Sequence, residues 1–386
     1  MHTLSAISSY ALDVTNPVGP PPPASLDTEA SAASKVLWEY TEANLGYVFD
    51  PPTLVKTRAY GWVVLIASGY NNPGGRGYLY VLNPRTGQLL QKIPLPSDAG
   101  TDDRPTGLST VRAFTSSRKD PYVLQAYSGD LNGNVWRFDL SSSDTAQWKA
   151  ELIATLTDGH DPQPITTGVR VEIDQNNNVD RYLFVGTGKL LDQPDIADAH
   201  VTNSLYVIRD GTRTVAELAP AEQTPPRGPY TRDDLNSVAG SCVGDAVTTC
   251  RGTPRSRGWF QDALDPKQKI GTDVYADVQT VVYSFSKPSA DPCGQPLEST
   301  LYARDLNSGS SVLESSGGGA VVASVDIGEG IAGIALIQGQ SGGSNFTGDV
   351  RVQVTTMKGQ VFSFGVRLAS GSSLKHRVSW RLINRD

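Results

Sequence analysis

The sequence of 386 residues has few of the residue types that build common catalytic and metal sites. Zinc sites usually draw paired cysteines and histidines at short spacing, but none of the three cysteines lies in a CxxC pair. The GTGKLL segment at 186–191 lacks the spacing of a phosphate-binding loop, and no nucleophile elbow or zincin pattern occurs. The sequence therefore predicts a protein that is not an enzyme. The four histidines are far apart in the chain: His2, His160, His200 and His376.

Two further shortages concern charge and long apolar runs. Lysine and arginine total 33 against 40 aspartates and glutamates, which leaves a net charge of -7 and argues against a nucleic-acid-binding surface. No apolar run approaches the roughly 20 residues needed to span a membrane. Met1 is followed by a polar segment without the charged and apolar regions of a signal peptide. We therefore expect the chain to be part of a longer protein.

Glycine and proline are abundant, with 38 and 25 residues. Together with 38% apolar and 19% charged residues, this composition favours many short strands joined by turns. We predict one all-β domain over 1–386. Within it, 17–34 reads as a proline-rich linker, and 211–279 reads as a long insertion because its hydrophobic patterning is weak.

The prediction of the fold depends most on one stretch, YSGDLNGNVWRFDL from Tyr127 to Leu140. Its Asp, Asn and Gly residues suit a tight turn between two strands. The two-residue period of a strand places Trp136 and Phe138 on one side, and Val135 and Arg137 on the other. The hairpin fits three roles: a blade unit of a β-propeller, a cradle for a cation through the oxygens of its turn, or an ordinary hairpin.

The pattern of this hairpin returns along the chain, which favours the propeller. Apolar runs followed by a turn and an aromatic strand begin near Tyr122, Tyr182, Thr280 and Val350, and four strand-like runs fall within 53–93. Four antiparallel strands in about 40 residues make one propeller blade. Because a single blade cannot bury both of its faces, such repeats stack around an axis.

A polar segment between two strand-like runs predicts a cation site. Asp174, Asn176, Asn178 and Asp180 alternate along VEIDQNNNVDRYLF. This is the spacing by which an EF-hand-like loop presents oxygen ligands to one calcium ion. The segment is also well suited to a plain Asx-rich turn, which is favoured because it lacks the usual glycine and the closing glutamate of that loop. Both interpretations remain open from the residues alone.

Five segments together resemble a known family. YALDVTNP with VLWEYT, GYNNPGGRGYLYVLNPRTG, YSGDLNGNVWRFDL, FVGTGKLLDQPDI and VSWRLINRD are similar, in that order, to the C-terminal domain of the PilY/PilC family of type IV pilus tip-associated adhesins. The resemblance implies a modified seven-bladed, quinoprotein-like propeller with long loop insertions. It further implies export, display at the pilus tip or outer cell surface, and contact with minor pilins. The implied roles are pilus biogenesis, twitching motility and adhesion to host or abiotic surfaces.

The resemblance also bears on calcium. Several family members bind Ca²⁺ through a DxDxNxxxD-like loop that precedes the YxGDLxGNxWRFD motif. Here the matching stretch carries Asp120 as its one carboxylate ahead of the YSGD segment, so it departs from the family pattern. The loop at 174–180 is the alternative site, in a different blade.

Two rival functions remain open at this stage. A quinoprotein-like dehydrogenase would need a tryptophan floor, a catalytic aspartate and a calcium site at one end of the channel, and no such set can be assembled. A structural scaffold would dock onto minor pilins by adding a strand to an exposed sheet edge. Of the cysteines, Cys242 and Cys250 are spaced to close a small loop in an exported protein, which leaves Cys293 over.

Overall fold

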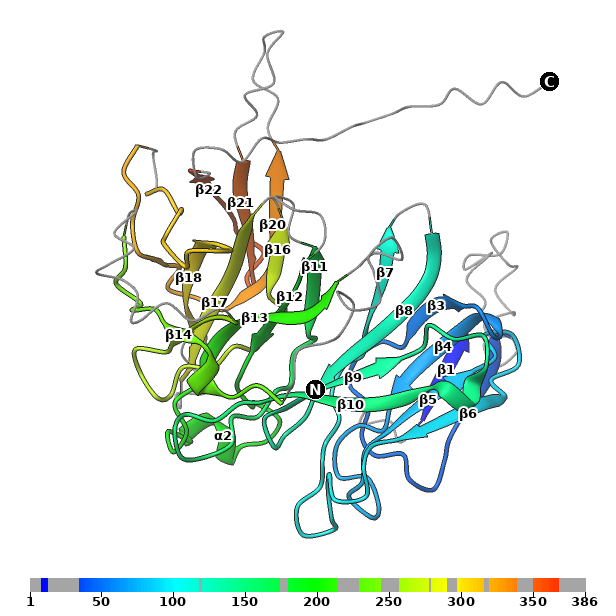
Figure 1. Ribbon diagram of the computed structural model, residues 1–386. Coiled ribbons are helices and arrows are strands. Elements are labelled where there is room, and N and C mark those ends of the chain that lie inside the picture. The colour runs from blue at the N-terminus through cyan, green and yellow to red at the C-terminus, as the bar shows by residue number, and fades with distance from the viewer. Residues whose placement is uncertain are drawn as a thin grey trace, which may run out of the picture.

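The computed structural model is a β-propeller whose sheets follow one another in an arc (Figure 1). The all-β prediction is confirmed, since the helical elements of the described chain are single turns, such as α2 (Pro194–Ala197). No helix in this part of the chain is long and apolar enough to cross a membrane. The structure describes residues 8–12, 35–117, 120–173, 180–213, 229–243, 257–277, 279–289, 297–315, 319–338 and 350–367.

The first two blades are antiparallel meanders of four strands each. A parallel bridge between Lys56 and Tyr122 joins them into one eight-stranded sheet. The first blade comprises β3 (Thr53–Thr57), β4 (Gly61–Ala67), β5 (Tyr78–Leu82) and β6 (Leu89–Pro94). The second comprises β7 (Arg112–Ser117), β8 (Asp120–Gly129), β9 (Asn134–Asp139) and β10 (Lys149–Thr155).

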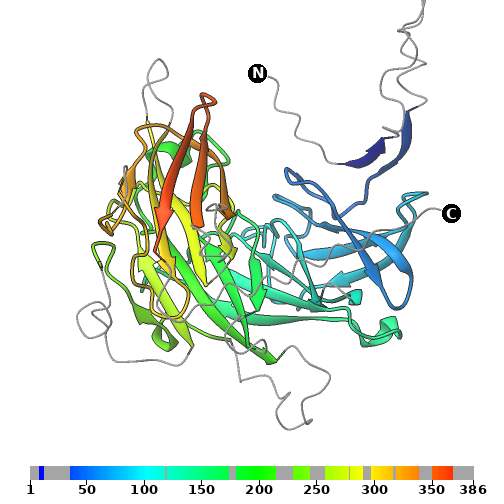
Figure 2. The same cartoon turned by 90° about the horizontal axis from the view of Figure 1, so that it is seen from above.

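Three further sheets continue the arc, and a two-stranded sheet stands at its other end (Figure 2). The third blade comprises β11 (Arg170–Ile173), β12 (Asp180–Gly186), β13 (Ser204–Arg213), β14 (Asn236–Ser237) and β15 (Gly258–Asp262). The fourth comprises β16 (Tyr275–Asp277), β17 (Thr280–Pro288), β18 (Leu297–Asp305) and β19 (Val325–Asp326). The fifth comprises β20 (Ile331–Gln338), β21 (Val350–Thr356) and β22 (Val361–Val366). The two-stranded sheet comprises β1 (Ser9–Leu12) and β2 (Val36–Tyr40), and the count of seven blades stays a prediction.

The hydrophobic core is divided into layers, each lying between two successive sheets. Trp136 and Phe138 of β9 pack in the layer shared with the first blade, whereas Val135 packs in the layer shared with the third. The predicted two faces of this strand are therefore confirmed. Because every inner blade is covered on both faces, its strands are apolar on both, and β17 is buried along almost its whole length.

The range 211–279 contains blade strands as well as connections. β14, β15 and β16 lie within it, and β15 pairs with β13 along its whole length. A strap at 229–238 joins two blades, because Tyr230 pairs with Ala154 of β10 and β14 pairs with β15. The proline-rich 17–34 lies outside the described residues. Cys242 is disulfide-bonded. The other two cysteines, Cys250 and Cys293, lie outside the described residues.

Candidate functional site

The Asp130 turn, between β8 and β9, lies among the loops at one end of the second blade. The Asp130 side chain is fully buried and accepts four hydrogen bonds. Its Oδ1 accepts from the backbone N–H groups of Asn132 and Asn134, at 2.9 and 2.8 Å. Its Oδ2 accepts from Asn134 Nδ2 at 3.0 Å and from Trp136 Nε1 at 2.8 Å. Both carboxylate oxygens are thus used to shape the turn, which favours the blade-hairpin interpretation over a cation cradle.

Burial changes the acidity of this carboxyl group. It raises the pKa of Asp130 to about 6, although the four donors favour the charged form and oppose the change. Asp130 therefore titrates close to the physiological range. The sequence already suggested an aspartate suited to a turn here, but not its complete burial.

The predicted calcium ligands are only partly within the described structure. Asp174, Asn176 and Asn178 lie outside it, and Asp180 is described through its backbone, which pairs with Arg213 at the start of β12. The flanking strands β11 and β12 pair antiparallel, as expected on either side of a turn. Elsewhere in the described ranges, no three His, Cys, Asp or Glu residues are grouped to hold a metal ion. The calcium site stays a prediction.

An open hollow of about 600 Å³ lies beside the Asp130 turn. Asp98 and Arg104, from the connection between β6 and β7, line one side, and Asn132, Asn134 and Trp136 line another. Arg104 Nε donates to Asn132 Oδ1 at 2.8 Å, so the β6–β7 connection is bonded to the Asp130 turn across the edge of the hollow. Sequence reasoning missed Arg104, because nothing in the TDDRP segment marks it as a neighbour of the turn.

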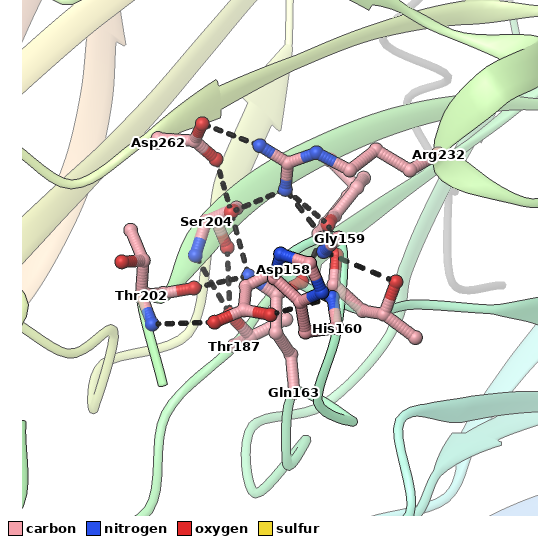
Figure 3. A network of polar contacts seen from close by, with 11 residues as sticks. Asp158, Gly159, His160, Gln163, Thr187, Thr202, Ser204, Arg232 and Asp262 are labelled. Carbon is pink, nitrogen blue, oxygen red and sulfur yellow. Dashed lines mark hydrogen bonds and ion pairs between the residues drawn. The ribbon is translucent and has the colours of Figure 1, made fainter. Parts of the chain in front are cut away.

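A polar network occupies the adjoining loops of the third blade (Figure 3). Ser204 Oγ donates to Asp262 Oδ1 at 2.7 Å and accepts from Gln163 Nε2 at 2.8 Å. Gln163 also accepts from the hydroxyl of Tyr206, and burial raises the pKa of that phenol to about 12. The network fixes the 155–163 loop against β13 and β15.

Arg232, on the 229–238 strap, completes this network. Its guanidinium pairs with Asp262, donates to Tyr206 Oη at 3.1 Å and lies 3.9 Å from the ring centroid of Phe260. Burial alone would lower its pKa, but the paired carboxylate outweighs burial and raises the pKa of Arg232. The strap is therefore attached to the loop face by charge as well as by strand pairing.

The network lacks the geometry of an activated nucleophile. Ser204 donates to a carboxylate that is already paired with Arg232, and in the described ranges no histidine side chain contacts this hydroxyl. His200 Nε2 lies 3.3 Å from Asp161 Oδ2 on the surface, and the His160 backbone donates to Asp158. His2 and His376 lie outside the described residues. Gln163, Ser204, Arg232 and Asp262 thus pair with one another.

The chain is similar to known proteins in sequence. A family model of the PilY1 beta-propeller domain matches residues 3–237. The type IV pilus biogenesis factor PilY1 of Pseudomonas aeruginosa strain UCBPP-PA14 is 26% identical over 345 residues, covering 76% of this chain and 28% of that protein. A PilY1 homolog of Xylella fastidiosa strain Temecula1 is 28% identical over 262 residues, covering 67% of this chain and 19% of that protein.

A solved structure agrees with the fold. The crystal structure of the Pseudomonas aeruginosa PilY1 C-terminal domain matches with a TM-score of 0.64 and 21% identity, covering 87% of this chain and 75% of that one. This similarity supports the propeller architecture. The chain spans less than a third of the length of the curated relatives that it matches.

Proposed function

The chain belongs to the PilY1 beta-propeller family, and from this premise we propose that it is the propeller domain of a type IV pilus biogenesis factor. The observation that carries the proposal is the match to relatives of that name over about three quarters of the chain. The propeller would act within a longer protein, since the relatives extend well beyond the matched part. Its export and its position at the pilus tip or outer cell surface belong to the same proposal.

We infer that the role is one of binding and assembly, without catalysis. The polar groups of the loop face pair with each other, as Arg232 does with Asp262 and Ser204 does with both Asp262 and Gln163. A catalytic group needs a partner that activates it and a free side toward a substrate. This arrangement supports recognition by preformed loops on a rigid scaffold.

The finer parts of the proposal concern partners, motility and calcium. Minor pilins are the partners within the pilus, and host or abiotic surfaces are the targets of adhesion, with twitching motility as the cellular readout. We propose that calcium binding by the 174–180 loop regulates this role. Hard oxygen ligands at alternate positions, between two paired strands, are the chemistry that supports it.

The test uses the full-length parent protein in its own bacterium. A strain without that protein is complemented with the intact parent or with a parent that lacks this propeller. We expect surface pili, counted by electron microscopy and as sheared pilin, to return only with the intact parent. Normal pilus numbers in the strain that lacks the propeller would contradict a role in biogenesis.

A second measurement separates adhesion from scaffolding. Pili that assemble normally but attach poorly to a surface would place the propeller in adhesion. Pili that fail to assemble would place it in the docking of minor pilins.

A further inference from the structure

We propose that the hollow between the β6–β7 connection and the second blade is a binding site for a neutral carbohydrate, lined by Asp98 and Arg104 on the connection and by Trp136 on β9. The inference goes beyond the role in pilus biogenesis and does not depend on it. It rests on the shape, the charge and the fixed polar groups of the hollow.

Three polar groups of the hollow, Arg104, Asn132 and Asn134, are held in place before any ligand arrives. Arg104 Nε donates to Asn132 Oδ1 at 2.8 Å, and Thr155 Oγ1 donates to Asn134 Oδ1 at 3.0 Å. These bonds leave the terminal nitrogens of Arg104 without a hydrogen-bond partner among the described residues. Groups that are already ordered bind a ligand with a smaller loss of conformational entropy.

The loop that carries Asp98 and Arg104 is itself anchored. Asp102 Oδ1 accepts from the backbone N–H of Gly74 at 2.7 Å, which also turns this carboxylate away from the hollow's lining. The backbone oxygen of Thr101 approaches Gly75 closely. A Cβ atom added to Gly75 would lie 1.9 Å from this oxygen. The loop that forms the rim is therefore held in place by its contacts with Gly74 and Gly75.

The charge of the lining selects against strongly charged ligands. Asp98 and Arg104 are the two ionisable residues among those that line the hollow, so their charges cancel. A carboxylate and a guanidinium each form paired hydrogen bonds to two adjacent polar atoms. Adjacent hydroxyl groups of a sugar ring match both, as donors to Asp98 and as acceptors from Arg104.

Part of the remaining lining is apolar. Pro96, Leu152 and Pro162 line the hollow together with the edge of Trp136, whose side chain is otherwise buried. A sugar ring presents carbon-bound hydrogens on its faces and hydroxyl groups around its edge, so it needs both kinds of surface. Small-molecule sites commonly combine apolar walls with a few placed polar groups, in volumes of about 300–1,000 Å³. The hollow of about 600 Å³ has room for a short saccharide.

The test measures sugar binding to the purified chain. The probes are the methyl glycosides of glucose, galactose and mannose, with N-acetylglucosamine and with glucose 6-phosphate as a charged comparison. Saturation-transfer NMR detects binding, and calorimetry measures the affinity. We expect saturable binding of at least one neutral probe in preference to the phosphate.

Two variants locate the binding. Each variant removes one charged group that would hydrogen-bond to the sugar. We therefore expect Arg104→Ala and Asp98→Asn each to weaken sugar binding about tenfold. Asp98 is exposed, so Asp98→Asn should leave the fold intact, and it guards against an unfolded Arg104→Ala protein. Arg58→Ala is the matched control, because Arg58 is an exposed arginine of the same two blades that faces Asp120 instead.

The inference is overturned by three results. These are no saturation transfer to any neutral probe, preferred binding of glucose 6-phosphate, or an affinity that Arg104→Ala and Asp98→Asn leave unchanged. Normal pilus numbers in a strain that carries Asp98→Asn in the parent protein are expected in every case. The proposed role in biogenesis and the proposed sugar site are therefore contradicted by different results.

Discussion

The buried carboxylate of Asp210 is paired with Arg137 across the boundary between two blades. Arg137 Nη1, from β9 of the second blade, lies 2.9 Å from Asp210 Oδ1 on β13 of the third. The second oxygen of Asp210 accepts from the Tyr127 hydroxyl at 2.8 Å and lies 3.5 Å from Arg181 Nη1. All four side chains are almost completely buried. The pair and its two neighbours therefore join the blades by charge, within a layer that is otherwise apolar.

Removing Asp210 should strongly destabilise the domain. Asp210→Ala leaves Arg137 and Arg181 buried with fewer partners, and breaking a buried pair by losing one partner typically costs about 3–5 kcal/mol. Urea denaturation of the variant and the wild type measures this loss. Glu151→Gln is the control, because Glu151 also pairs with Arg137 but is about a third exposed and should cost much less. Equal stability of the Asp210→Ala variant and the wild type would show that the blades do not rely on this pair.

Gly133 should tolerate alanine poorly because of two separate effects. Its φ of 77° is strained for any residue with a Cβ, and that Cβ would lie 2.3 Å from the Leu156 carbonyl oxygen. Gly359 is a matched control, since its φ is 80° but no atom lies within 4 Å of its built Cβ. Both substitutions should pay the backbone strain of about 1 kcal/mol, and Gly133→Ala should lose more because its loop must move. Thermal unfolding of the two variants compares them directly, and equal losses would argue against the close approach to Leu156.

The raised pKa of Asp130 predicts a specific dependence of stability on pH. Burial raises this pKa from 3.8 to about 6, so the folded protein holds the proton more tightly than the unfolded chain does. The contribution of Asp130 to the free energy of unfolding is largest below 3.8, the pKa in the unfolded chain. This contribution is lost as the pH rises through about 6, the pKa in the folded protein. The shift of about two pKa units corresponds to up to about 3 kcal/mol.

Asp130→Asn isolates this effect. The amide does not titrate, so the stability difference between the wild type and the variant should widen in favour of the wild type as the pH falls from about 7 to about 4. The variant should be less stable at every pH, since an amide nitrogen in the place of Oδ2 faces two donors, Trp136 Nε1 and Asn134 Nδ2, and can accept from neither. Denaturation series across this pH range measure the difference, and a difference that stays constant would contradict the raised pKa.

Calcium should bind to the purified chain through the 174–180 loop. Calorimetric titration should give one saturable site in the micromolar range of about 10⁻⁷–10⁻⁵ M, as for sensor loops with oxygen ligands. The double variant Asp174→Ala/Asp180→Ala should lose it, and chelation with EDTA should return the wild type to its metal-free state. Asp120→Ala serves as the control at the position that matches the family loop. A flat isotherm for the wild type would make the 174–180 loop an ordinary hairpin turn.

The sequence by itself determined the local features of this protein. The two-residue period of VWRFD assigned Trp136 and Phe138 to one face and Val135 to the other, and the core layers confirm that division. The GDLNG segment identified a turn, because Asp130 bonds to backbone donors within a few residues of itself. These features were predictable since strand alternation and turn chemistry depend on neighbouring residues only.

Only the tertiary structure decided which distant residues meet. Arg137 and Asp210 are 73 positions apart in the chain, and Arg104 and Asn132 are 28 apart. Nor did the weak patterning of 211–279 reveal that β15 lies within the third blade or that Arg232 attaches the strap to Asp262. Such contacts depend on how successive sheets rotate and pack around the axis, and local periodicity carries no information about that geometry.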